Sequence, residues 1–265
     1  MMLVFCTFLL LFLHTSITLA NEKQDLSVIA DPQKSGEYVR KRFNALQGKA
    51  FSANDQRKKL LLVGDSHAQD VLNMLAENNK LDGYQVRTRK IPTQCQIYLG
   101  DEQARYIQPK DKPLCANADN LQRAKKQLAE ADVVILASNW KLWAVKSLTN
   151  TLDQLALKPT QKLIIIGRKN FGKINIRRYM RLSEEKRLAL KNEVDNVQLA
   201  INQQMKNSLN NKQWVDVHAL ICGNNQSKTC PVFTPTGELI SFDGGHLTKA
   251  GASYIGQQLL TRINL

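Results

Sequence analysis

The stretch Gly64-Asp65-Ser66-His67 places a hydroxyl where it could act as a nucleophile. An apolar run precedes it and predicts a buried strand at 59–63, and a sequence suited to a helix follows it. Gly64 allows a sharp turn, because it tolerates dihedral angles that a side chain forbids. Ser66 would then stand where strand becomes helix. The same position also suits an ordinary helix cap, since serine side chains accept hydrogen bonds from the N2 or N3 amide.

A second pair of residues, near the C-terminus, has a spacing suited to acid–base chemistry. Asp243 and His246 are three positions apart, with Gly244 and Gly245 between them to let the loop turn sharply. Such a loop allows a carboxylate to accept the Nδ1–H of the imidazole while Nε2 is offered to a hydroxyl. The alternative for His246 is a histidine at a helix start or in the core.

Strand-like and helix-like stretches alternate along the chain. Short apolar runs bounded by turn residues predict strands at 59–63, 83–91, 132–138, 162–168 and 213–221. Apolar residues at steps of three and four predict helices through Leu142, Val145, Leu148, Leu152 and Leu155, through Leu190, Val194, Val197, Ile201 and Met205 after a cap at Ser183, and through Ala252, Ile255, Leu259 and Ile263 after Thr248. This alternation predicts an α/β/α sandwich with a mainly parallel, doubly wound sheet.

In such a sheet, ligands bind beyond the carboxyl ends of the strands. Ser66 follows the first predicted strand directly, and Asn139 comes just past the third. The Asn139 side-chain amide could therefore face the same crevice as the Ser66 hydroxyl. A plain turn residue is the alternative reading of Asn139.

The composition indicates one globular domain, or one domain with an extension. The chain has 265 residues, 43% of them hydrophobic and 23% charged. Thirty-seven Lys and Arg against 23 Asp and Glu give a formal net charge of +14, which favours contact with anionic glycans or membrane surfaces. The densest basic segment, 168–182, contains Arg177, Arg178 and Arg181, and a solvated basic face is the alternative to a polyanion contact.

The first 20 residues predict a secretory signal peptide cleaved after Ala20, because their apolar run is too short to cross a bilayer comfortably. No Lys or Arg precedes that run, so an uncleaved anchor is the alternative. Residues 21–55 are polar and weakly patterned, and we expect an extension that packs at the edge of the domain formed by 56–265. Export to the periplasm or the exterior argues against nucleic acid as a partner.

Four cysteines remain beyond that segment, and they predict disulfides. An even number in an exported chain favours pairing, and proximity favours Cys95 with Cys115 and Cys222 with Cys230 among the three possible pairings. A zinc site is the alternative, but the spacings are not of the tight C-x2–4-C type and no histidine lies beside them. His218, in a strand-like run, is expected to be structural. We expect no metal and no cofactor.

Three motifs in this order resemble the SGNH, or GDSL-like, hydrolase superfamily: GDS after the first strand, an Asn at the end of a middle strand, and D-x-x-H before the last helix. More narrowly, "VGDSHAQD", "VVILASNW" and "CPVFTPTGELISFDGGHLTKAGA" resemble the SGNH domains that accompany integral-membrane O-acyltransferases modifying bacterial surface glycans. The resemblance covers residues 56–265 and implies the SGNH hydrolase fold, with a flavodoxin-like sheet.

The resemblance also implies roles for individual residues. Ser66 would be the nucleophile, His246 the general base and Asp243 the group that orients it. The Ser66 amide and the Asn139 side chain would donate to the oxyanion. Family members usually add a donor from a glycine after the second strand, but Gly83 is too early and Gly100 too late to supply it.

Three further residues are considered as substrate contacts. His67 takes the place of the Leu of GDSL, as it does in this branch of the family, and is given no catalytic role. Trp140 and Trp143 could stack on a sugar, and packing against the sheet is the alternative for at least one of them.

Three functions follow as expectations. The first is an exported O-acyltransferase that moves an acetyl or similar group onto a surface polysaccharide, receiving it from a membrane acyltransferase partner. The second is an esterase that removes such groups. The third is a catalytically idle SGNH fold that binds glycan through its basic face. The triad does not separate the first two, because they differ in which nucleophile reaches the acyl-enzyme and in how well water is excluded.

Overall fold

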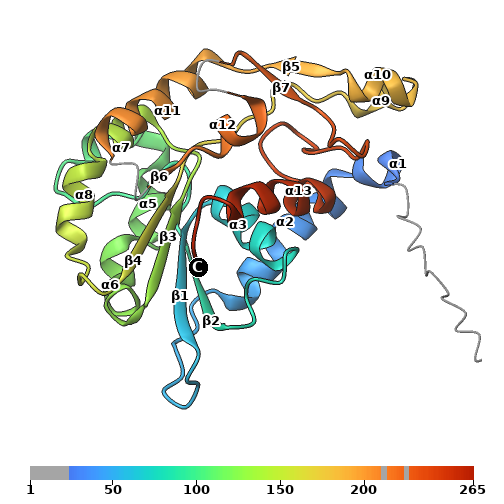
Figure 1. The fold of residues 1–265 in the computed structure, drawn as a ribbon. Coiled ribbons are helices and arrows are strands. Elements are labelled where there is room, and N and C mark those ends of the chain that lie inside the picture. The colour runs from blue at the N-terminus through green and yellow to red at the C-terminus, as the bar shows by residue number, and fades with distance from the viewer. Residues whose placement is uncertain (1–23, 210–213, 224–226) are drawn as a thin grey trace, which may run out of the picture.

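The structure, a computed structural model, describes residues 24–209, 214–223 and 227–265 (Figure 1). The predicted signal peptide at 1–20 lies outside the described residues. Within them, no helix is both long and apolar enough to span a membrane.

A five-stranded parallel sheet forms the centre of the molecule. Its order is β2-β1-β3-β4-β6, and its strands are β1 (Lys58–Gly64), β2 (Tyr84–Lys90), β3 (Val133–Ala137), β4 (Lys162–Ile166) and β6 (Trp214–Val215). The register places Gly64, the last residue of β1, beside Lys90 on one side and Ala137 on the other. The carboxyl ends of three neighbouring strands therefore meet at one point of the sheet edge.

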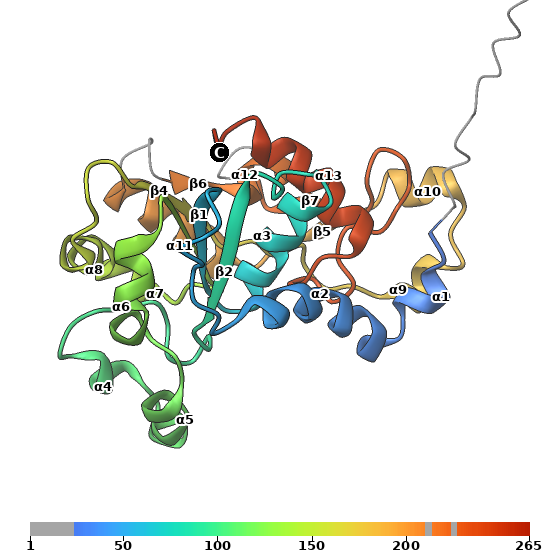
Figure 2. The same cartoon turned by 90° about the horizontal axis from the view of Figure 1, so that it is seen from below.

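Helices cover both faces of the sheet, as Figures 1 and 2 show. On one face lie α2 (Pro32–Leu46), α3 (Ser66–Ala76), α12 (Val217–Cys222) and α13 (Lys249–Leu260). The other face carries α6 (Leu121–Glu130), α7 (Leu142–Lys146), α8 (Leu148–Leu155) and α11 (Asn196–Ser208). Each face of the sheet packs against its helices in a hydrophobic core of its own. Side chains of β1 alternate between these cores: Leu60 and Leu62 pack on the side of α3, and Leu61 and Val63 pack on the side of α6 and α7. This arrangement confirms the predicted three-layer sandwich.

Smaller elements lie at the carboxyl ends of the sheet strands and at the periphery of the molecule. They are α1 (Leu26–Ile29), α4 (Gln103–Tyr106), the 3₁₀ turn η1 (Pro109–Asp111), α5 (Lys112–Asn117), α9 (Ile176–Tyr179), α10 (Glu184–Leu188) and the antiparallel pair β5 (Lys191–Glu193) and β7 (Thr229–Pro231). In Figure 1 the segment carrying α9 and α10 extends away from the sheet. The disulfides Cys95–Cys115 and Cys222–Cys230 are both present, which confirms the predicted pairing.

Several predicted elements have different bounds in the structure. Residues 217–222 are helical rather than part of a strand, because the Asp216 side chain accepts the backbone N–H of Ala219 and caps a helix there. The helix predicted through 142–155 is interrupted at Ser147. The one predicted after Ser183 is replaced by α10, β5 and α11, with Asp195 as the cap of α11.

The N-terminal segment contains a helix, α2, that was not among the predicted elements. Asp31 caps α2 and Pro32 occupies its first turn, which is a favoured position for proline. Phe43 is fully buried in the core that α3 shares with β1. The extension is therefore part of the layer that carries Ser66.

Candidate active site

The turn between β1 and α3 positions Ser66. Gly64 has a φ of +149°, and a Cβ there would lie 1.7 Å from the Ala137 carbonyl oxygen, so glycine is required on both counts. The cap of α3 is Asp65, whose side chain accepts the backbone N–H of His67 at 2.9 Å. Ser66 is the first helical residue and is half-buried. The structure thus assigns capping to Asp65 and leaves the Ser66 hydroxyl outside that role.

The Asp65 carboxylate joins the ends of three strands. Besides the His67 amide it accepts the Thr93 hydroxyl at 2.7 Å, the Ser138 hydroxyl at 2.8 Å and the Asn139 backbone N–H at 2.9 Å. Thr93 follows β2, and Ser138 and Asn139 follow β3. Because Asp65 is almost fully buried, these hydrogen bonds are shielded from water and fix the segments around Ser66 relative to one another.

The loop before α13 holds Asp243 and His246 together. The Asp243 carboxylate lies 2.6 Å from His246 Nδ1 through one oxygen and accepts the His246 backbone N–H at 2.8 Å through the other. Gly244 has a φ of +93°, and a Cβ there would lie 2.1 Å from the Gly172 carbonyl oxygen, so the loop needs glycine at this point. The predicted carboxylate–imidazole contact is present in the structure.

Two opposing effects act on the pKa of Asp243. Burial by itself would raise it, but hydrogen bonds from the His246 ring and from the backbone N–H groups of His246 and Gly245 outweigh this effect. The pKa of Asp243 is consequently lowered from its ordinary value. An ionised carboxylate is therefore available at neutral pH to accept a hydrogen bond from Nδ1–H, which leaves Nε2 as the ring nitrogen offered to a hydroxyl.

The loop formed by residues 243–247, called the histidine loop below, is hydrogen-bonded to α3, the helix that begins with Ser66. The backbone N–H of Leu247 donates to Asp70 Oδ1 at 3.2 Å, and Asp70 lies four residues after Ser66, on the same face of α3. This contact places His246 next to the first turns of α3. No hydrogen bond joins the Ser66 hydroxyl to His246 in the structure, and such bonds often tighten only when substrate is bound.

Asn139 is placed at this edge through its backbone rather than its side chain. Its N–H donates to Asp65 and its carbonyl accepts Gln96 Nε2 at 3.2 Å. Among the hydrogen bonds of the described residues, none involves the Asn139 side chain, which leaves its amide available as a donor. Gln96 follows β2 with a φ of +59°, a conformation that glycine would adopt more readily.

The structure contradicts one predicted substrate contact. Trp140 is 0% exposed, and its indole N–H donates to the Ile166 carbonyl at 2.8 Å, so it is a core residue beneath the site. Trp143 is half-buried and stacks on the exposed Tyr106 ring, with 4.9 Å between centroids. The motif around Trp140 does not distinguish a packing indole from an exposed one.

His67, the residue after Ser66, is buried. Burial lowers its pKa well below the ordinary value, and the positive charges of Lys169, His246 and Arg168 act in the same direction. Its Nδ1 has no hydrogen-bond partner within the described part of the chain. His67 is therefore neutral at physiological pH, and its ring has little surface to offer a substrate.

The basic segment 168–182 divides between the interior and the surface. Lys169 is buried and its Nζ lies 2.6 Å from Asp70 Oδ2, whereas Arg177, Arg178 and Arg181 are exposed. Arg168 is half-buried, and its backbone is fixed by the amide side chains of Gln198 and Asn202. The sequence did not separate these two groups, because charged residues in a basic run look equally solvated.

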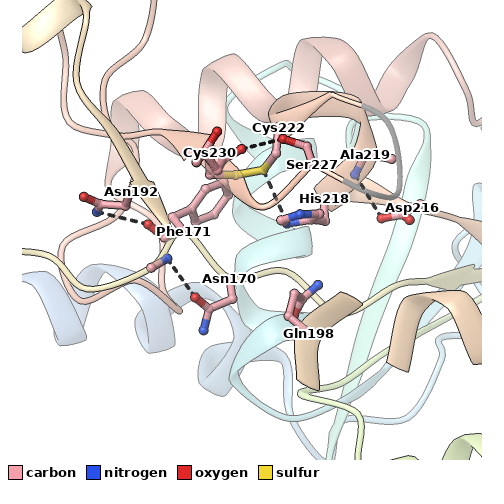
Figure 3. Close-up of a disulfide and its surroundings, with 12 residues drawn as sticks. Asn170, Phe171, Asn192, Gln198, Asp216, His218, Ala219, Cys222, Ser227 and Cys230 are labelled. Carbon is pink, nitrogen blue, oxygen red and sulfur yellow. Dashed lines mark hydrogen bonds between the residues drawn. A yellow bond between two sulfur atoms is a disulfide. The ribbon is translucent and has the colours of Figure 1, made fainter. Parts of the chain in front are cut away.

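A histidine does lie beside a disulfide, contrary to the sequence expectation (Figure 3). His218 and Cys222 are four residues apart on α12, and His218 Nδ1 lies 3.3 Å from Cys222 Sγ. The donor atoms of His218, Cys222 and Cys230 lie within 4.8 Å of one another. Both sulfurs belong to the disulfide, so they are not available as the thiolate ligands that a metal requires.

The doubly wound sheet, with a Gly-Asp-Ser turn after β1 and an Asp-x-x-His loop before the last helix, defines the SGNH class of α/β proteins. The family described as "SGNH domain (fused to AT3 domains)" matches residues 34–261, and the chain belongs to this family. The matched range includes most of α2. No curated protein matches the chain in sequence.

A solved structure shares the fold. The lipopolysaccharide acetyltransferase periplasmic domain of Salmonella ser. Paratyphi A superposes with a TM-score of 0.58 at 17% sequence identity, covering 88% of this chain and 95% of that one. At this identity the likeness shows the fold alone.

Proposed function

We propose that this protein is an exported SGNH-type serine enzyme that transfers or hydrolyses acyl groups, acetyl above all, on a bacterial cell-surface polysaccharide. The observation that carries the proposal is the Asp243–His246 pair, 2.6 Å apart, on a loop attached to the helix that begins with Ser66. Two comparisons support the substrate class: the family is one fused to acyltransferase domains, and the structural relative is a lipopolysaccharide acetyltransferase domain.

In the proposed reaction, Ser66 Oγ attacks the carbonyl carbon of an acyl ester and its proton passes to His246 Nε2. Asp243 accepts a hydrogen bond from Nδ1–H and stabilises the imidazolium that forms. The Ser66 backbone N–H and the Asn139 side chain donate to the oxyanion, and loss of one such donor typically raises the barrier by about 3–4 kcal/mol. The leaving oxygen takes the proton from His246, which leaves an acyl-enzyme at Ser66.

The second half of the reaction decides between the two enzyme functions. His246 removes a proton from the incoming nucleophile, which is water in an esterase and a sugar hydroxyl in a transferase. For transfer, the acyl donor would be supplied by a membrane acyltransferase partner, because the family is described as fused to such domains. The exposed Arg177, Arg178 and Arg181 would favour an anionic glycan or membrane surface as the site of action.

The test compares purified wild-type protein with Ser66→Ala in the hydrolysis of p-nitrophenyl acetate. Ser253→Ala is the matched control, since Ser253 lies on α13 outside the site. We expect Ser66→Ala to lose at least about 10³-fold in rate, as triad removal does in serine hydrolases, and the control to lose nothing. A Ser66-dependent rate that rises when an acceptor oligosaccharide is added would indicate transfer. Equal rates in all three proteins would instead favour a glycan-binding module without catalysis.

A further inference from the structure

Lys169 and Asp70 form a buried ion pair beside the candidate active site. Lys169 follows β4 by three residues, its side chain is 2% exposed, and its Nζ lies 2.6 Å from Asp70 Oδ2. The Asp70 side chain is 0% exposed. Burying two charges costs desolvation energy, and well-packed apolar residues are often as stable or more stable in such positions. Stability alone therefore does not account for the pair.

Both charged groups also contact the histidine loop. Lys169 Nζ donates to the Gly245 carbonyl, and Asp70 Oδ1 accepts the Leu247 backbone N–H at 3.2 Å. Gly245 and Leu247 are the two neighbours of His246. The backbone is thus fixed immediately before and immediately after the candidate base, by the two members of one ion pair.

The pair connects this loop to the nucleophile. Asp70 lies on α3 one turn beyond Ser66 and on the same helix face, so the carboxylate that fixes Leu247 is rigidly placed relative to the Ser66 hydroxyl. A second contact supports the same arrangement, because the Phe171 N–H donates to the Gly244 carbonyl at 2.8 Å and joins the Lys169 loop to the histidine loop. Three segments distant in sequence are in this way fixed around one point.

We propose that Asp70 and Lys169 are positioning residues that set the separation and angle between His246 Nε2 and Ser66 Oγ. This inference rests on the proposed function of Ser66 and His246. The competing account is purely structural: each charge is present only to neutralise the other. The two accounts differ in what happens when both charges are removed together.

The first experiment therefore uses Lys169→Met and the double variant Asp70→Asn/Lys169→Met. Lys169→Met leaves Asp70 buried without its cation, so it is destabilised under either account. The double variant carries no charge at either of these two buried positions, and we expect its thermal unfolding midpoint to return toward the wild-type value. Its kcat for p-nitrophenyl acetate should stay about 10²-fold below wild type, with KM little changed, because misplacement of a catalytic group costs rate rather than binding. Recovery of wild-type kcat in the double variant would overturn the proposal.

Lys173→Met is the matched control, because Lys173 lies in the same segment but is exposed. It removes one positive charge near the site without touching the histidine loop. We expect wild-type kcat and an unchanged unfolding midpoint. A loss of kcat equal to that of the double variant would attribute the effect to long-range charge and would count against positioning.

A measurement on the wild-type protein keeps the inference testable if the variants do not fold or the enzyme proves inactive. The Leu247 amide should exchange with deuterium only through global unfolding, as the buried amides of β1 and β3 do. In the double variant, if folded, it should exchange at least about tenfold faster while the strand amides are unchanged. Fast Leu247 exchange in the wild type would exclude a fixed loop. Absence of Ser66-dependent hydrolysis would instead refute the proposed function and leave this result standing.

Discussion

Three consecutive residues, Asp65, Ser66 and His67, have different environments and different consequences. Asp65 is buried and its carboxylate accepts hydrogen bonds from four groups. Ser66 is half-buried at the start of a helix, and His67 is buried with one ring nitrogen unpartnered within the described residues. A serine left out of the capping interaction is the consequence that matters for chemistry.

The buried His67 predicts a pH dependence of stability. Its pKa in the folded state lies well below the unfolded value of about 6.5, so the unfolded chain binds more protons as the pH falls. Through His67, the free energy of unfolding should therefore decrease as the pH falls below 6.5, by up to about 1.4 kcal/mol per pH unit. We expect His67→Leu to decrease less steeply in urea titrations between about pH 6.5 and 5. Parallel slopes for both proteins would contradict the burial argument.

Residue types and spacing were sufficient to predict some contacts of the candidate site but not others. Asp243 and His246 were predicted from a three-residue interval across two glycines, a local signal that needs no knowledge of the fold. The position of Lys169 depends on a contact with Asp70, 99 positions earlier, and a lysine within a basic run carries no sign of burial. The substrate role predicted for Trp140 was wrong, because this side chain is fully buried. Its burial depends on the segments that pack against it, and the local sequence does not show them.

At the scale of elements, the site depends on how the strand ends are joined. The register aligns the ends of β1, β2 and β3, and the Asp65 carboxylate then fixes the segments that follow each of them. Ser66 and Asn139 are thereby fixed at one edge although they are more than 70 positions apart. The Asp65 carboxylate therefore links the segments that follow β1, β2 and β3 through hydrogen bonds.

Asp65→Asn tests this role. The substituted amide offers one oxygen in place of two and turns an NH2 group toward donors, so some of the His67, Thr93, Ser138 and Asn139 donors lose their acceptor. Unsatisfied buried donors cost about 1–3 kcal/mol each, and we expect the free energy of unfolding to fall by about 3 kcal/mol in urea denaturation. Asp153→Asn, at an exposed position on α8, should change it by less than about 0.5 kcal/mol. Equal free energies of unfolding for the two variants would refute the proposed linking role of the Asp65 carboxylate.

Element prediction succeeded for the four longer strands of the sheet and failed where a capping hydrogen bond decides between strand and helix. β1, β3 and β4 were predicted within two residues of their ends, because the buried parts of these strands leave continuous apolar runs. β2, which alternates apolar and polar residues, was predicted within one residue of its ends. Residues 217–221 have a similar composition but follow Asp216, whose capping hydrogen bond selects a helix. The helix α2 was missed because its hydrophobic positions are few and it is stabilised by packing on α3 rather than by a strong pattern.

At the scale of the whole molecule, the carboxyl edge of the sheet collects contributions from segments spread over most of the chain. The β1–α3 turn, the segments after β2, β3 and β4, and the loop before α13 all meet there. The basic segment 168–182 is divided between two environments. Lys169 is buried in an ion pair with Asp70, whereas Arg177, Arg178 and Arg181 are exposed. The site is therefore a property of the complete fold, and no single motif contains it.

The central claim is that Ser66 is acylated with the help of His246. The most direct measurement is mass spectrometry of the acid-quenched protein after brief exposure to p-nitrophenyl acetate, in wild type, Ser66→Ala and His246→Ala. We predict one acetyl group on the peptide containing Ser66 in the wild type, none on that peptide in Ser66→Ala and a much slower gain in His246→Ala. An unmodified Ser66 peptide in the wild type, or equal labelling with and without His246, would contradict the account.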